Sequence, residues 1–456
     1  MENMENVDQK SLYYLEKAPV SKAIMHMVIP MMLSLIANII YNITDAFFIG
    51  KLENTAMMAA VTLALPFSVI LMALGQLFAV GSGTYVSRLL GEDNVDEIKK
   101  VSSVNFWSSM IAGIMFMAIC VPLLTPLLHL LGARGDTLLY TRDYIKVFVI
   151  GAPFVIGSFS LGEIVRAEGA STDSMIGMLL GIIINIILNP VFIFSFHLGV
   201  TGSALASVIG NILSVAYFIY YLQKKSSVQS VSIKDFKWSR EIYINIFKVG
   251  VSAFLLDCFM AVTCLLFNNY STLYGDSVVA GLGIAQRVVQ AVDFIGMSFS
   301  MGAVPLIAFA YSAKNQERLM EIIKKVVLYM VGITLALSVI LFILRAQIIG
   351  IFSIDPKVIA IGQTILLAQL CSTLFAGLSA LFTSIFQAFG TGGQSTIMSV
   401  VRGIFFVPIL ILGNLLFTVN GVIWANTISE GLACIVGLTM WLMIRRKSLQ
   451  EISMNE

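Results

Sequence analysis

Runs of about 20 to 30 predominantly apolar residues recur along the chain from Ala23 to Ile444. A helix needs about 20 such residues to cross the hydrocarbon core of a bilayer, because each residue advances it by about 1.5 Å. A strand of a membrane β-barrel needs only about ten alternating residues, so runs of this length exclude that architecture. The pattern predicts a polytopic, all-α membrane protein.

The composition supports this class and excludes others. Of the 456 residues, 58% are hydrophobic and 12% are charged, whereas soluble globular chains have about 25% charged residues. These values exclude a soluble enzyme and a disordered chain, and a net charge of +2 gives no basic field for nucleic acid. All five cysteines fall inside apolar runs and are expected to be small buried hydrophobes.

The span length divides the chain into twelve predicted transmembrane helices joined by short polar loops. They cover residues 23–49, 57–83, 101–131, 138–166, 174–196, 200–222, 242–270, 277–311, 322–352, 358–388, 395–417 and 419–444. The predicted domains are an N-terminal segment (1–22), a six-helix bundle (23–222), a linker (223–241), a second six-helix bundle (242–444) and a tail (445–456).

The distribution of lysine and arginine predicts the orientation. If the N terminus is cytoplasmic, cytoplasmic segments hold 20 of the 28 basic residues and external segments hold six. The other two, Arg287 and Arg402, lie within predicted helices. Since cytoplasmic loops are enriched in basic residues, we expect a multi-pass protein of the cytoplasmic membrane with both termini inside.

The two bundles repeat each other at a shift of 221 residues. Matching pairs include Ala59 with Ala280, Gly75 with Gly296, Gly81 with Gly302, Asn94 with Asn315, Ala167 with Ala388 and Gly169 with Gly390. Because each repeat has an even number of helices, both bundles enter the membrane in the same orientation. A pseudo-twofold axis along the membrane normal then relates them, which is a transporter architecture that works by alternating access.

Polar residues in the first bundle form a candidate ion-coupling site. Given the predicted orientation, Asp45, Asn185 and Asn189 lie in the outer halves of their helices, and Ser207 lies about two turns below the outer surface. A carboxylate with amide and hydroxyl oxygens can hold a proton or a small hard cation. The alternative is that these groups only bond one helix to another.

The second bundle carries a candidate substrate site. Asp257 and Asp293 fall near the middles of their helices, where a charged group costs at least about 2.5 kcal/mol on insertion scales. Either Arg287 or Arg402 could pair with one of them, so each aspartate either contacts the substrate or only forms an ion pair. Glu430 is open to the same two interpretations. The remaining cavity candidates, chosen for their flexible or aromatic side chains near Asp293, are Phe294, Met297, Phe299 and Met301.

Motifs for catalysis and nucleotide binding are missing from the sequence. It has no phosphate-binding loop and no His-Glu-x-x-His, and its three histidines lie near the ends of predicted segments. We therefore expect no enzyme activity and no cofactor, and transport that is passive or driven by an ion gradient.

At the level of motifs, the chain resembles the multidrug and toxic compound extrusion (MATE) transporters over nearly its whole length. The resemblance is carried by Asn42-Ile-Thr-Asp45, Gly81–Asn94, Arg166-Ala-Glu-Gly169, Asn185-Ile-Ile-Leu-Asn189-Pro190 and Val304-Pro305-Leu-Ile-Ala. The N-terminal stretch 12–32 and the loop 131–136 look closest to the MepA-like branch of bacterial multidrug exporters.

The resemblance implies secondary active efflux of diverse cationic amphiphiles, driven by inward H⁺ or Na⁺ flow. It also implies an ion site at Asp45, Asn185, Asn189 and Ser207. Asn189 stands where the family commonly has Asp, so the site holds one carboxylate. This favours H⁺ and leaves Na⁺ at Asp45 as the metal candidate. The expected partners are drugs, dyes, toxic cations and membrane lipids, and the expected state is a monomer.

Two alternatives remain open. A lipid-linked oligosaccharide flippase could share the architecture, but it needs a strongly cationic cavity for its pyrophosphate, and only Arg287 and Arg402 lie within the helices. A channel or a receptor is the other alternative, and the internal duplication argues against a receptor.

Overall fold

The computed structural model describes residues 9–131, 133–353 and 355–453. The outermost parts of the predicted terminal segments, 1–8 and 454–456, and the loop positions 132 and 354 lie outside the described residues. The first half contains α1 (Gln9–Glu16), α2 (Val20–Gly50), α3 (Thr55–Gly91), α4 (Val95–Leu130), α5 (Gly135–Ala167), α6 (Ser171–Pro190), a π-helical turn η2 (Val191–Ser195) and α7 (Gly199–Lys224). The second half contains α8 (Arg240–Thr272), α9 (Asp276–Gly302), α10 (Val304–Ser312), α11 (Gln316–Ile343), α12 (Arg345–Phe352), α13 (Pro356–Ala388) and α14 (Gly392–Ser453).

The predicted all-α membrane fold is confirmed. Eleven helices within the described residues are long and apolar enough to cross a membrane. The last of them, Gly392–Ile444, contains Thr418, whose φ of 52° and ψ of −131° are not helical. The chain turns at this residue, so α14 comprises two spans and the total matches the predicted twelve.

The 221-residue repeat is visible in the helix boundaries. Helix α5 (Gly135–Ala167) and α13 (Pro356–Ala388) begin and end at positions 221 residues apart. The same shift carries α3 (Thr55–Gly91) onto α9 and α10 taken together, which cover 276–312. The two halves therefore share the same helical organisation.

Two predicted spans are broken in the structure. The predicted helix 277–311 is interrupted at Ala303 between α9 and α10. Pro305 lies two residues further on, and a proline has no backbone N–H to continue the helical hydrogen bonds. The predicted helix 322–352 is interrupted at Leu344 between α11 and α12, without a proline or glycine beside the break.

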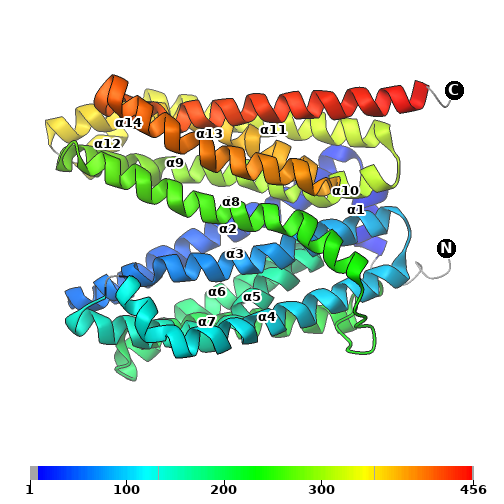
Figure 1. The fold of residues 1–456 in the computed structure, drawn as a ribbon, viewed down its shortest axis with the longest axis horizontal. Coiled ribbons are helices and arrows are strands. Elements are labelled where there is room, and N and C mark those ends of the chain that lie inside the picture. The colour runs from blue at the N-terminus through cyan, green and yellow to red at the C-terminus, as the bar shows by residue number, and fades with distance from the viewer. Residues whose placement is uncertain (1–8, 132, 354, 454–456) are drawn as a thin grey trace.

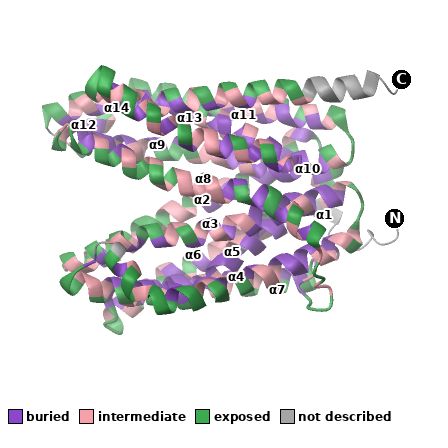
Figure 2. Ribbon diagram, viewed as in Figure 1, coloured by how far each residue is buried: buried purple, intermediate pink, exposed green. Residues whose placement is uncertain are grey.

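The two halves meet at one end of the molecule and diverge toward the other (Figure 1). Both termini lie at the end where the halves meet. There α2 packs on α9 and α11, and α3 packs on α8 and α10. Figure 2 shows buried residues concentrated at this junction and exposed residues along the outer helices and at the divergent end.

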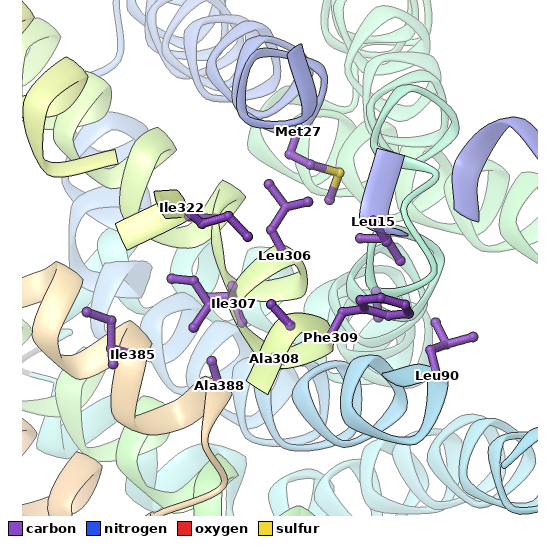
Figure 3. Packing of buried hydrophobic residues seen from close by; sticks show 14 of the residues in the cluster. Leu15, Met27, Leu90, Leu306, Ile307, Ala308, Phe309, Ile322, Ile385 and Ala388 are labelled. Atoms are coloured by element: carbon purple, nitrogen blue, oxygen red, sulfur yellow. The ribbon is translucent and has the colours of Figure 1, made fainter. Parts of the chain in front are cut away.

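A hydrophobic cluster that draws on both halves closes the junction. It includes Met27 and Leu90 from the first half and Leu306, Phe309 and Ile385 from the second, all of them buried. In Figure 3, Phe309 of α10 points toward Leu90 of α3 and toward Leu15 of the short helix α1. Burial of apolar surface therefore holds this end of the molecule together.

Glycines allow the helices of the two halves to approach closely at the junction. A Cβ at Gly81 of α3 would overlap the backbone carbonyl of Ile246 on α8, and a Cβ at Gly250 of α8 would overlap that of Leu77 on α3. Small residues at such crossings let two membrane helices come into backbone contact. These contacts fix the position of α8 against the first half.

Candidate functional site

The carboxylate of Asp45 is held by two hydrogen-bond donors in the first half. Asn189 of α6 donates through Nδ2 to Asp45 Oδ1 at 2.7 Å, and the hydroxyl of Ser203 on α7 donates to the same oxygen. Asn189 and Ser203 are buried, and Asp45 is half-buried. Both donors contact Oδ1, so Oδ2 is the carboxylate oxygen left without a hydrogen bond among the described residues.

A second polar layer lies one helical turn from the first. Ser207 Oγ accepts a hydrogen bond from Asn185 Nδ2 at 3.0 Å and is bonded to the Tyr41 hydroxyl at 3.0 Å. It also donates to the backbone carbonyl of Ser203 at 3.1 Å, which joins the two layers. Residues four apart on a helix share a face. Helices α2, α6 and α7 therefore each supply one residue to each layer.

The structure separates the predicted ion-coupling residues into these two layers. Asn189 contacts Asp45, whereas Ser207 does not and bonds with Asn185 instead. Ser203 contacts the carboxylate in place of Ser207, because α7 starts at the divergent end and reaches the level of Asp45 one turn earlier than predicted. A sequence pattern could have predicted this contact: polar residues spaced by four occur on α2, α6 and α7.

Two buried amide oxygens in this cluster have no partner among the described residues. They are Oδ1 of Asn185 and Oδ1 of Asn189. An amide oxygen is a ligand for hard cations, and an unsatisfied buried acceptor costs about 1–3 kcal/mol. The oxygen atoms of one carboxylate, two amides and the nearby hydroxyls could therefore hold either a proton or a small cation. Within the described residues, no group of three His, Cys, Asp or Glu side chains forms a denser metal site.

A cavity of about 710 Å³ lies in the second half. Its walls come from α8, α9, α13 and α14, and Gln76 and Val80 of α3 contribute from the first half. The volume is in the range of pockets that take drug-sized ligands. Six of the predicted substrate-site residues line it: Asp257, Arg287, Asp293, Met297, Met301 and Arg402.

The prediction that Phe294 and Phe299 line the cavity is wrong. Phe299 is 1% exposed and belongs to the hydrophobic cluster at the junction, and Phe294 is not among the lining residues. Each residue of a helix turns by about 100°. Phe299 therefore lies about 200° around α9 from Met297, and Phe294 about 100° from Asp293.

Arg402 is paired inside the cavity wall, and its partner is Glu430. Its Nη2 donates to Glu430 Oε1 at 2.9 Å and its Nε lies 3.2 Å from both carboxylate oxygens. Ser379 of α13 donates a further hydrogen bond to Glu430 Oε2 at 2.5 Å. Arg402 therefore neutralises Glu430 and neither of the two aspartates.

Three charged groups of the cavity remain unpaired. Over the described residues, Asp257, Arg287 and Asp293 form no ion pair, and Oδ2 of Asp257 is buried without any hydrogen bond. An isolated charge inside a membrane protein is costly unless water or a ligand reaches it. The cavity thus offers two carboxylates and one guanidinium to whatever enters it.

Comparison with known proteins agrees with this geometry. The MatE family model matches residues 30–191 and again residues 251–412, so both ends of the second match lie 221 residues after those of the first. The chain is 39% identical over 444 residues to the multidrug export protein MepA of Staphylococcus aureus (strain MRSA252), which covers 97% of this chain and 98% of that protein. It is 38% identical to the MepA protein of Staphylococcus saprophyticus over 96% of each chain.

Solved structures share the fold. One is described as the outward-facing conformation of a multidrug resistance MATE family transporter of the MOP superfamily; it superposes with a TM-score of 0.90 at 24% identity, over 97% of this chain and 99% of that one. Taken with the membrane-spanning helices, the relatives indicate a multi-pass protein of the plasma membrane. The chain belongs to the MatE family and is a multidrug efflux transporter.

Proposed function

We propose that the transporter exports cationic amphiphilic compounds by antiport with H⁺, with Asp45 as the coupling carboxylate. The observation that carries this is the contact pattern of Asp45, whose two hydrogen-bond donors, Asn189 and Ser203, both bond Oδ1. Oδ2 is then the atom that takes up a proton.

The arrangement favours a proton over Na⁺. Asn189 directs its NH₂ group, not its oxygen, at Asp45, so a cation at the carboxylate would require that amide to turn over. Protonation of Oδ2 requires no new ligand oxygen.

Drug and proton occupy separate places in this proposal. The proton binds in the first half at Asp45, and the drug binds in the second-half cavity beside Asp257 and Asp293. Coupling between two sites requires that each ligand favour a different conformation. With the termini in the cytoplasm, the halves are closed at the cytoplasmic end, so this state releases drug outward and admits protons.

The charge of the cavity disfavours the flippase alternative. Its lining includes three carboxylates and two guanidinium groups, and the Arg402–Glu430 pair removes one of each. The remaining groups, Asp257, Asp293 and Arg287, attract cations on balance and would repel a pyrophosphate. This supports cationic substrates.

The test uses proteoliposomes loaded with ethidium. H⁺ and Na⁺ gradients are imposed separately on the wild type and on Asp45→Asn. We expect the wild type to show efflux with the H⁺ gradient alone. In Asp45→Asn, the rate of efflux should fall to that of ethidium-loaded liposomes without protein. The matched control is Asp276→Asn at the exposed start of α9, which should transport normally. Efflux driven by Na⁺ alone, or normal efflux by a well-folded Asp45→Asn protein, would contradict the proposal.

A further inference from the structure

The connection between α7 and α8, residues 225–239, is bonded along its first part to the first half. Ser103 of α4 donates to the Ser232 carbonyl at 2.7 Å, and the indole N–H of Trp107 donates to the Val231 carbonyl at 3.2 Å. These bonds hold the connection against the side of α4. In Figure 1 it is the green loop at the end of the molecule that carries both termini.

This connection lies level with the start of two membrane-spanning segments. Trp107 and Ser108 lie about two turns inside the predicted span 101–131. Ser108 Oγ is bonded at 2.7 Å to the hydroxyl of Tyr243, which lies at the start of the predicted span 242–270. Because both spans begin at this level, the connection lies at the boundary between the hydrocarbon and the lipid headgroups.

The second part of the connection exposes large apolar side chains. Ile233 is 60% exposed and Trp238 is 79% exposed. All four tryptophans lie within the described residues, and Trp238 is the exposed one. Contact of this much apolar surface with water is unfavourable, whereas indole rings are enriched at the level of the headgroups, where one end of the side chain is in apolar and the other in polar surroundings. These two side chains therefore suit the surface of a bilayer.

Basic side chains stand beside the exposed tryptophan. Three of them are exposed: Lys234, Lys237 and Arg240. Over the described residues, none of the three forms an ion pair. Of the acids alongside, Asp235 accepts a hydrogen bond from the Ser230 hydroxyl at 2.5 Å, and Glu241 lies in the first turn of α8, where the positive end of the helix dipole stabilises it. The unpaired charge of this surface is therefore positive.

We propose that residues 233–240 form a binding site for anionic phospholipids. Ile233 and Trp238 enter the headgroup region of the bilayer, and the three basic side chains bind the phosphates of the headgroups by charge-assisted hydrogen bonds. The same residues join the first half to α8, so bound lipid ties the connection between the halves to the membrane surface. This inference does not depend on the proposed coupling ion or substrate.

The experiment measures contact between Trp238 and lipid of known headgroup. The full chain, with Trp424→Phe and Trp441→Phe, is reconstituted into phosphatidylcholine liposomes. A fixed fraction of the lipid is replaced by acyl-brominated phosphatidylcholine or by acyl-brominated phosphatidylglycerol, whose bromine quenches the fluorescence of tryptophans in contact with it. A parallel chain that also carries Trp238→Phe gives the signal of Trp107 alone, and the difference between the two chains gives that of Trp238.

The charge is tested by two matched sets of substitutions. The first set is Lys234→Gln, Lys237→Gln and Arg240→Gln together. The control set removes two lysines and one arginine that are exposed at the divergent end of the molecule: Lys51→Gln, Arg134→Gln and Lys357→Gln. A third protein, with Lys234→Arg and Lys237→Arg, keeps the charge of the site.

We expect both brominated lipids to quench Trp238, with a relative affinity for phosphatidylglycerol about fivefold or more above that for phosphatidylcholine. The first set should abolish this preference and leave quenching by brominated phosphatidylcholine in place. The control set and the arginine variant should keep the preference. The signal of Trp107, which is bonded to the connection, should be the same in all proteins and shows that the variants are folded.

Three results would overturn the assignment. If neither brominated lipid quenches Trp238, the surface faces water and fits a soluble partner instead. Equal relative affinity for the two lipids in the unsubstituted site would mean that Trp238 touches the bilayer without a headgroup site beside it. A preference for phosphatidylglycerol that survives the first set, with Trp107 unchanged, would assign headgroup binding to other residues.

Discussion

At the residue scale, two serines on one face of α7 have different neighbours. Ser203 donates to the carboxylate of Asp45, whereas Ser207 bonds with Asn185 and Tyr41. A hydrogen bond to a charged group contributes about 1.5–3 kcal/mol. The proposed coupling role of Asp45 should therefore depend on Ser203 more than on Ser207.

The same substitution at the two serines tests this difference. Ser203→Ala removes one of the two donors to Asp45 and should lower the initial rate of H⁺-driven ethidium efflux about tenfold or more. Ser207→Ala leaves both donors in place and should lower the rate only slightly. Comparable losses in both variants would show that the two layers act as a single unit.

At the element scale, sequence length and hydrophobicity predicted the spans because a bilayer imposes both on a helix. The break at Ala303 was missed because proline is tolerated inside membrane helices: Pro66 and Pro153 lie within continuous α3 and α5. Depth along each helix correctly predicted that Asn189 lies beside Asp45. It placed Ser207 at that depth, whereas Ser203 contacts the carboxylate, because one turn is within the error of a predicted boundary.

A side chain from the other half binds the C-terminal end of helix α1. Arg318, near the start of α11, donates to the carbonyls of Tyr14, Leu15 and Ala18 at 2.9–3.1 Å. A helix of eight residues is too short to be stable alone. Arg318→Ala should therefore raise hydrogen exchange of residues 12–18 about tenfold or more. Arg345→Ala at the start of α12 removes a hydrogen bond to the Phe342 carbonyl instead and should leave this exchange unchanged. Unchanged protection, measured by mass spectrometry, would show that packing of Leu15 alone holds the helix.

At the scale of the whole molecule, the proposed transport cycle requires the junction between the halves to open. The contacts there include apolar side chains from both halves and glycines at helix crossings, together with hydrogen bonds from Arg88 to the Gln387 and Ala388 carbonyls. Small residues at a helix crossing let two backbones come into contact and leave no room for a larger side chain. The glycine crossings are therefore the contacts most sensitive to side-chain volume.

Gly91 offers a way to test this. A Cβ there would lie 2.5 Å from the Phe309 carbonyl and 3.0 Å from Ser312 Cβ on α10, so Gly91→Leu should wedge the junction apart and favour the opposite access state. The reporter is Cys264, which is exposed and lines the cavity, with the other four cysteines replaced by alanine. A membrane-impermeant maleimide added outside intact cells should label Cys264 in the Gly91 parent and label it several-fold more slowly in Gly91→Leu. Gly332→Leu, where a Cβ has nothing within 4 Å, should label like the parent. Faster labelling in Gly91→Leu would reverse the predicted orientation, because the divergent end would then face the cytoplasm.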